Sequence, residues 1–183
     1  MSVLITDVPT YAGGSYGVTH TDKGALDWLT SKGWGGSLLD VGCGPGGQVA
    51  LAISLGWRAI GIDVDPDLYR LPGVALIDLC QAPVLLPTRA NAVWSVEVAE
   101  HIPPEGTDNY LTTLVSNAAN VLIMSANQHS GSYHINIQPV GWWVGKVAAK
   151  GMVYRPDLYK ELLAHSTMQR EFLKETGMVF AWT

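Results

Sequence analysis

The segment LLDVGCGPGGQ, residues 38–48, constrains the fold of this chain more than any other part of the sequence. Five of the six residues that follow its mainly apolar start are glycine or proline. Gly42, Gly44 and Gly47 match the pattern G-x-G-x-x-G, and Asp63 follows about 20 residues later. Between a strand and a helix, such glycines form a tight turn that a ligand can approach closely. We therefore expect a ligand to lie against the backbone at this turn.

Apolar runs alternate with helical patterns along the rest of the chain. Strands are expected at residues 37–42, 57–63, 74–79, 91–97, 120–126 and 177–182, and helices at 21–33, 48–56, 107–120, 141–151 and 155–166. Thr21 is expected to cap the first of these helices. The alternation predicts an α/β fold with a doubly wound, Rossmann-like, mostly parallel sheet and helices on both faces. We expect one domain over residues 1–183, with residues 1–14 as a loose N-terminal segment.

Composition and charge narrow the function classes. Hydrophobic residues make up 48% of the chain and charged residues 15%, which is typical of compact rather than disordered proteins. The chain starts without a signal-peptide pattern, and no apolar run approaches the roughly 20 residues that cross a membrane, so we expect a cytoplasmic protein without a membrane partner. The net charge of −5 argues against broad electrostatic attachment to nucleic acid. Residues 141–183 are mildly basic, with six Lys or Arg against four Asp or Glu, which suits either an anionic substrate or a solvated helix face.

The residues around the glycine turn discriminate between possible ligands. A P-loop is excluded because no Lys-Ser or Lys-Thr follows the glycines. A dinucleotide stays open, but Asp40 would repel its pyrophosphate, and Pro45 removes one N–H from the turn. A cationic, zwitterionic nucleoside such as S-adenosylmethionine fits better. Its amino group suits Asp40, its carboxylate suits the remaining N–H groups of the turn, and its ribose diol suits Asp63 at the end of the second strand.

The combination LLDVGCGPGG…AIGIDVDP resembles the first two motifs of the class I S-adenosylmethionine-dependent methyltransferases, and the resemblance extends over roughly residues 15–183. It implies an enzyme in which Asp63 holds the ribose hydroxyls and Asp78 lies near the adenine amino group, with Leu79 beside it. Two alternatives stay open: Asp63 as a strand-end residue, and Asp78 as an N-cap or solvated acid. The expected cofactor contacts are Asp40, Gly42, Gly44, Asp63, Asp78, Leu79 and Glu97.

The segment SVEVAEHIPPE, residues 95–105, follows the fourth expected strand and carries Glu97, Glu100 and His101. In a helical turn, spacings of three and four place these side chains on one face. The turn must be brief, because the residue before Pro103 is biased toward extended geometry. The segment departs from the pattern of amino-group methyltransferases. It resembles the E-x-x-E-H motif of ubiquinone-pathway O-methyltransferases and of small-RNA 2′-O-methyltransferases, in which two carboxylates and a histidine bind a divalent metal.

This resemblance implies metal-assisted methylation of a hydroxyl, since a divalent metal (Mg, Mn, Fe or Zn) lowers the pKa of a bound hydroxyl. The expected metal ligands are Glu97, Glu100, His101 and, in the segment HINIQ, His134. In that segment polar and apolar residues alternate, so we expect an extended stretch with one polar face. Alternatives stay open: Glu97 and His101 as an ordinary helical pair, Glu97 as a metal-free cofactor contact, and His134 as a structural histidine. Glu97, His101 and His134 are the candidate catalytic residues.

The sequence thus predicts an S-adenosylmethionine-dependent methyltransferase that acts on a hydroxyl of a small or polar acceptor. The alternatives are an NAD(P)-dependent oxidoreductase and a catalytically silent S-adenosylmethionine-binding protein. A nucleic-acid acceptor stays open but is not favoured. Tyr133, Trp142 and Trp143 either stack on the acceptor or anchor their segment to the core, and one of the two tryptophans is expected to be buried.

Overall fold

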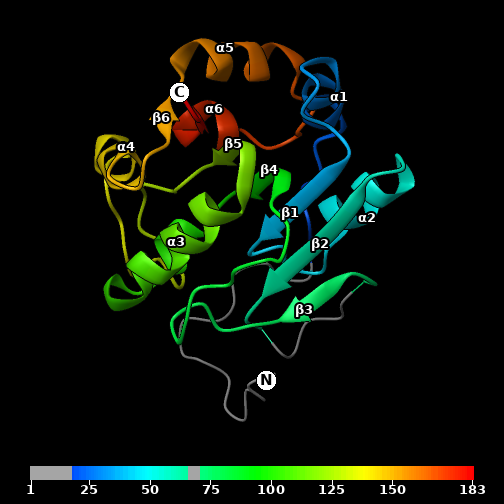
Figure 1. The fold of residues 1–183 in the computed structure, drawn as a ribbon. Coiled ribbons are helices and arrows are strands. Elements are labelled where there is room, and N and C mark those ends of the chain that lie inside the picture. The colour runs from blue at the N-terminus through cyan, green and yellow to red at the C-terminus, as the bar shows by residue number, and fades with distance from the viewer. Residues whose placement is uncertain (1–17, 66–70) are drawn as a thin grey trace.

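The computed structural model describes residues 18–65 and 71–183, and the loose segment expected at residues 1–14 lies outside these ranges. Seven strands form one sheet in the order β3-β2-β1-β4-β5-β7-β6 (Figure 1). The five strands β1 to β5 pair in parallel, and β7 lies antiparallel between β5 and β6. Their bounds are β1 Ser37–Val41, β2 Arg58–Asp63, β3 Val74–Leu76, β4 Ala90–Ser95, β5 Ala118–Met124, β6 Val153–Tyr154 and β7 Met178–Ala181.

In the described part of the chain, six α-helices cover the two faces of this sheet: α1 Lys23–Ser31, α2 Gly47–Ser54, α3 Thr107–Asn117, α4 Val140–Ala148, α5 Pro156–His165 and α6 Phe172–Thr176. The apolar stripes of α3 and α4 form one core cluster with the sheet, and those of α1, α2, α5 and α6 form the other. Figure 1 shows α1 and α5 packed side by side, so an N-terminal and a C-terminal helix meet there. The doubly wound α/β architecture is thus confirmed.

Local differences from the sequence-based expectation have local causes. The side chain of Asp22, not Thr21, caps α1 by accepting a hydrogen bond of 2.9 Å from the N–H of Ala25. The fourth strand stops at Ser95 because Glu97 adopts a left-handed conformation, with φ of 58°. The short elements β6 and α6 were not predicted, since two and five residues are too few to show a hydrophobic period.

The parallel strands place their carboxyl ends along one edge of the sheet. Asp40 near the end of β1 is level with Gly61 of β2 and with Trp94 of β4. The loops that leave β1, β2, β4 and β5 therefore meet there, as expected for a ligand site in a doubly wound sheet. In residues 18–65 and 71–183, every helix is too short or too polar to cross a bilayer.

Candidate functional site

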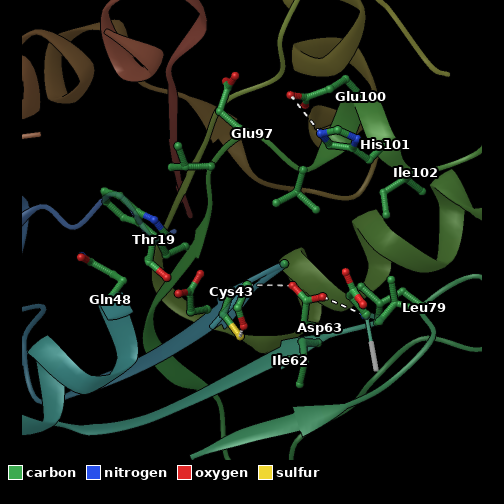
Figure 2. Close-up of a pocket in the computed structure, with 18 of the residues that line it drawn as sticks. Thr19, Cys43, Gln48, Ile62, Asp63, Leu79, Glu97, Glu100, His101 and Ile102 are labelled. Carbon is green, nitrogen blue, oxygen red and sulfur yellow. Dashed lines mark hydrogen bonds and ion pairs between the residues drawn. The ribbon is translucent and has the colours of Figure 1, made fainter. Parts of the chain in front are cut away.

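A cavity of about 660 Å³ opens at the carboxyl ends of the parallel strands. Its wall combines the glycine turn, the ends of β2 and β4, and segments from both ends of the described chain. In Figure 2, Asp63 and Cys43 lie on one side of this cavity and Glu100 and His101 on the other. We call the side of the cavity around Asp63 and Cys43 the cofactor half. We call the side around Glu100 and His101 the acceptor half.

The glycines of the turn are required by its geometry. Gly42, Gly44 and Gly46 have φ values of 73°, 54° and 92°, a region that side chains disfavour. A Cβ atom on Gly42 would lie 2.3 Å from a methyl group of Val98, so the turn passes directly against the loop after β4. The glycine pattern thus serves the close packing of two loops as well as the approach of a ligand.

The backbone N–H groups of the turn already have acceptors within the protein. Gly42 and Cys43 donate to the carbonyl of Ile62, Gly44 to Asp63, Gly46 to the carbonyl of Cys43, and Gly47 to the hydroxyl of Thr19. Pro45 has no N–H to donate. Each N–H group of residues 42–47 thus has an internal acceptor, and the expectation that these groups receive the carboxylate of a cofactor stays a prediction. The same arrangement leaves no cradle for a pyrophosphate at the turn.

Two aspartates define the electrostatics of the cofactor half. The carboxylate of Asp63 accepts hydrogen bonds from the N–H groups of Gly44 at 2.7 Å and Asp65 at 3.0 Å, although burial raises its pKa. Asp40 is buried beside it, and this burial, together with the charge of Asp63, raises the pKa of Asp40 from 3.8 to about 8. A cation that reaches Asp40 stabilises its charged form.

Asp78 and Leu79 also line the cavity, after β3. The Asp78 carboxylate accepts a hydrogen bond of 2.8 Å from the N–H of Cys80 and one of 3.3 Å from the side chain of Gln81, so it closes a turn. Leu79 is buried in the same core cluster as Ile62. Both predicted positions therefore line the cavity, and Asp78 has a local structural role as well.

Glu97 stands apart from the other residues of its motif. Its carboxylate accepts hydrogen bonds from the hydroxyl of Ser125 at 2.8 Å and from the side-chain amide of Asn127 at 3.0 Å, both just past β5. Between Glu97 and His101, residues Ala99–His101 form a helical turn of the 3-10 type. The prediction that Glu97, Glu100 and His101 share one helical face is therefore wrong, because Glu97 precedes that turn in a left-handed conformation.

The structure instead brings Glu100 and His101 together with His134. One ligand atom from each of the three lies within 4.8 Å of the others. Glu100 is fully buried, its carboxylate forms no side-chain hydrogen bond within the described residues, and its Oε1 atom lies 3.9 Å from the Nε2 atom of His101 (Figure 2). Burial, reinforced by the charge of Glu97, raises the pKa of Glu100 to about 8. A buried acid of this kind calls for a proton or a cation.

The two histidines are oriented by backbone carbonyls. The Nδ1 atom of His101 lies 3.0 Å from the carbonyl of Tyr133, and that of His134 lies 2.7 Å from the carbonyl of His129. Because a carbonyl only accepts, both Nδ1 atoms carry a proton, so the neutral form of each ring has its lone pair on Nε2. Burial and the neighbouring His134 lower the pKa of His101, which favours this neutral form. Neutral imidazoles with a carbonyl on the far nitrogen are typical metal ligands or bases.

The segment after His134 is folded with its polar side chains inward. Asn136 is buried and donates to the carbonyl of Ile102 at 3.0 Å, and its own N–H and that of Ile135 donate to the carbonyl of Glu100. Ile135 and Ile137 are 48% and 41% exposed. The predicted alternation is confirmed, but the polar face serves to hold the Glu100 loop. Trp143 is the fully buried member of the tryptophan pair.

A roof, of which sequence reasoning missed the C-terminal part, closes the cofactor half. It consists of residues 18–20 and 166–172, which include Thr19, His20, Arg170 and Phe172 in the cavity wall. The rings of His20 and Phe172 meet edge to face, with centroids 5.3 Å apart. The basic balance of residues 141–183 was the one sequence signal for this roof.

Comparisons with known proteins define the fold. No protein-family model matches the chain, and no curated protein matches it. A TehB-like SAM-dependent methyltransferase from Corynebacterium glutamicum is similar in structure, with a TM-score of 0.65 at 16% identity over 87% of this chain and 88% of that one. Magnesium protoporphyrin IX methyltransferase from Synechocystis, with bound SAH, has a TM-score of 0.60 at 16% identity over 86% of this chain and 80% of that one.

The methyltransferase domain of the bacterial protein CtHen1 has a TM-score of 0.57 at 18% identity, over 86% of this chain and 96% of that domain. At these identities the similarity is one of fold. The chain therefore has the Rossmann-like fold of S-adenosylmethionine-dependent methyltransferases, over almost all of its described residues.

Proposed function

We propose that this chain is an S-adenosylmethionine-dependent methyltransferase that acts on a hydroxyl group of a small or polar acceptor. The observation that carries the proposal is the glycine turn. The N–H groups of residues 42–47 donate to acceptors within the protein, and acidic side chains line the cavity beside the turn. A pyrophosphate finds no donors there, whereas a cationic nucleoside finds carboxylates. Structural neighbours with bound SAH or SAM add support for this cofactor.

Each acid of the cofactor half has a part in this proposal. Asp40 receives the amino group of the cofactor, and the cation shifts its raised pKa downward so that it binds as a carboxylate. Asp63 binds the ribose diol with the lone pairs that Gly44 and Asp65 leave available. Asp78 and Leu79 flank the adenine.

The acceptor half offers groups that bind and deprotonate a hydroxyl. The oxygen attacks the methyl carbon, the carbon–sulfur bond breaks, and its electron pair returns to sulfur to give S-adenosylhomocysteine. The hydroxyl proton must leave the oxygen during this step. The neutral Nε2 of His134 or of His101, or the carboxylate of Glu97, accepts this proton. Holding the acceptor in line with the sulfonium contributes much of the acceleration.

The same half fits a divalent metal. The fit rests on the buried oxygens of Glu100, which form no side-chain hydrogen bond within the described residues, and on the Nε2 atoms of His101 and His134, which would hold the ion with them. When bound, the metal would lower the pKa of the acceptor hydroxyl. Glu97 lies outside this group of three because Ser125 and Asn127 hold its carboxylate, so we assign it to the edge of the metal site.

Cofactor choice is tested by thermal unfolding with S-adenosylmethionine, S-adenosylhomocysteine and NAD. The first two should raise the Tm and NAD should leave it unchanged, because only a ligand of the native state stabilises it. Stabilisation by NAD alone would establish the oxidoreductase alternative. A chain that binds S-adenosylmethionine but releases no S-adenosylhomocysteine with any hydroxyl acceptor would be the silent binding protein.

Metal dependence is tested separately. Titration of the chelator-treated protein with Mn²⁺ should show binding in a calorimeter, and Glu100→Gln should remove it. Activity should disappear on chelation and return with Mn²⁺ or Mg²⁺. Full turnover after prolonged chelation would leave His134, His101 or Glu97 as a metal-free base.

A further inference from the structure

The charged residues that line the cavity are unevenly distributed. Six carboxylates face it, from Asp40, Asp63, Asp65, Asp78, Glu97 and Glu100. Arg170 is the only Lys or Arg among the lining residues of the described ranges. An anionic group that enters this cavity is repelled from most of its wall and attracted to the roof.

The methionine part of S-adenosylmethionine carries such an anionic group beside its amino group. With the amino group at Asp40, the carboxylate lies close to the glycine turn. The N–H groups of residues 42–47 already donate to internal acceptors, so the turn offers this carboxylate no free donor. The side chain of Gln48, at the start of α2, is also engaged, since its amide pairs with the backbone of Asp22 in both directions.

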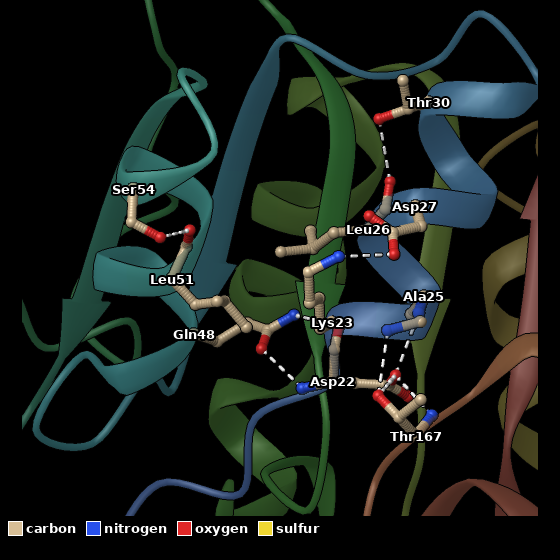
Figure 3. A network of polar contacts seen from close by, with 11 residues as sticks. Asp22, Lys23, Ala25, Leu26, Asp27, Thr30, Gln48, Leu51, Ser54 and Thr167 are labelled. Atoms are coloured by element: carbon tan, nitrogen blue, oxygen red, sulfur yellow. Dashed lines mark hydrogen bonds and ion pairs between the residues drawn. The ribbon is translucent and has the colours of Figure 1, made fainter.

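Arg170 stands in the segment that closes over this end of the cavity. Asp22 anchors the segment: its carboxylate accepts hydrogen bonds from the hydroxyl of Ser166 and from the N–H of Thr167, the latter at 2.9 Å. Figure 3 shows Asp22 between Gln48 on one side and Thr167 on the other. The roof and the helix that follows the glycine turn are thus tied to one buried residue.

The guanidinium of Arg170 has no hydrogen bond or ion pair with the rest of the described chain, although acids are near in sequence. Glu171 pairs instead with Lys174 at 2.9 Å, outside the cavity wall. Next along the roof, Phe172 packs on His20, which holds the segment against the first residues of the described chain. Arg170 is therefore a positively charged side chain that lines the acidic cavity and is not paired with another described residue.

We propose that Arg170 binds the carboxylate of the methionine part of S-adenosylmethionine, opposite the amino group held at Asp40. This inference rests on the proposed function and extends it to the roof. An arginine forms two parallel hydrogen bonds with a carboxylate, so it fixes the orientation of the methionine part as well as its charge. The roof then closes on the cofactor by direct contact with it.

The experiment compares S-adenosylmethionine with decarboxylated S-adenosylmethionine by calorimetry. The wild-type chain should bind the carboxylated form about tenfold more tightly or better, where tenfold corresponds to about 1.4 kcal/mol. Arg170→Gln should lose this preference. Its affinity for the decarboxylated form should stay within about twofold of wild type, because that form has no carboxylate for Arg170 to bind. Arg170→Lys should retain part of the preference, since it keeps the positive charge but cannot form two parallel hydrogen bonds with the carboxylate.

Lys174→Gln is the matched control, because it removes a positive charge from the same segment outside the cavity wall, and it should keep the full preference. An unchanged preference in Arg170→Gln would overturn the proposal, as would equal weakening of both cofactors, which would indicate a distorted roof. If the wild type binds the two forms equally, no residue anchors the carboxylate, and the proposal fails even without a folded variant. Binding of neither form to the wild type would instead refute the proposed function itself.

Discussion

The two halves of the cavity each contain one buried acid whose pKa is raised to about 8, Asp40 in the cofactor half and Glu100 in the acceptor half. Their surroundings differ. Asp40, near the end of β1, lies beside another carboxylate, Asp63, and next to the glycine turn, whose N–H groups already have acceptors. Glu100 lies beside the imidazoles of His101 and His134, and its Oε1 atom is 3.9 Å from the Nε2 atom of His101.

This difference indicates what each half is built to receive. An acid among acids is stabilised by an organic cation, which supplies charge and hydrogen bonds without needing further ligands. An acid among imidazole lone pairs is stabilised by a metal ion or by a proton shared with a substrate. The predictions below separate these two environments, from the largest expected effect to the smallest.

Replacing Glu100 with Gln should affect the acceptor half alone. Turnover should fall by about a hundredfold or more, the size seen when a group that stabilises the transition state is lost. Affinity for S-adenosylmethionine should stay within about twofold, because the cofactor is held from the other half. Kinetics and calorimetry on the same preparation test this. Glu105→Gln, an exposed change in the following turn, should leave both quantities at wild-type levels. Parallel losses of turnover and cofactor affinity would show that the halves are not separable.

Replacing Asp63 with Ala should affect the cofactor half. Loss of charge-assisted hydrogen bonds to a diol, at roughly 1.5–3 kcal/mol each, should weaken binding of S-adenosylmethionine by tenfold or more. The turn also loses the acceptor of the Gly44 N–H, so a lower Tm is expected. Calorimetry checks the affinity and circular dichroism the fold. An unchanged affinity in a folded variant would reduce Asp63 to a structural residue of the turn.

Asp40→Asn should change how stability depends on pH. The folded pKa of about 8 exceeds the ordinary value of 3.8, so between these values the unfolded chain binds fewer protons than the native one. The free energy of unfolding of the wild type should therefore fall as the pH rises through this window and level off above about 8. The variant lacks this contribution and should gain stability relative to wild type from pH 5 to pH 8. Urea unfolding at both pH values measures the difference, and identical pH slopes would contradict the assignment. Glu100→Gln should show the same sign.

Asn127→Ala should have the smallest effect. Glu97 loses one donor, at 3.0 Å, and keeps the hydroxyl of Ser125. One hydrogen bond of about 0.5–1 kcal/mol corresponds to a roughly two- to fivefold change in turnover, with cofactor affinity unaffected. A loss as large as that of Glu100→Gln would place Glu97 among the metal ligands or bases that act directly on the acceptor.

Much of the cofactor half could be predicted from the sequence. The alternation of apolar runs determined the sheet, and the glycines with Asp63 located the turn, because left-handed backbone and a strand-end acid depend on a few neighbouring residues. The same local logic correctly predicted a brief helical turn before Pro103. It did not predict that the N–H groups of the turn would donate to acceptors within the protein, because two of these acceptors, the hydroxyl of Thr19 and the carbonyl of Ile62, belong to other segments of the chain.

The acceptor half and the roof were decided by tertiary structure. Hydrogen bonds from Ser125 and Asn127 hold Glu97 away from the group of Glu100, His101 and His134. The sequence by itself determined the fold, the glycine turn and the residue types at the strand ends, all of which follow from short-range periodicity and backbone preference. Tertiary structure decided which of those side chains face one another. It also placed Arg170 in the cavity wall, on a roof that Asp22 anchors. Both depend on contacts between segments far apart in the chain, and these contacts form only when the sheet and its helices pack together.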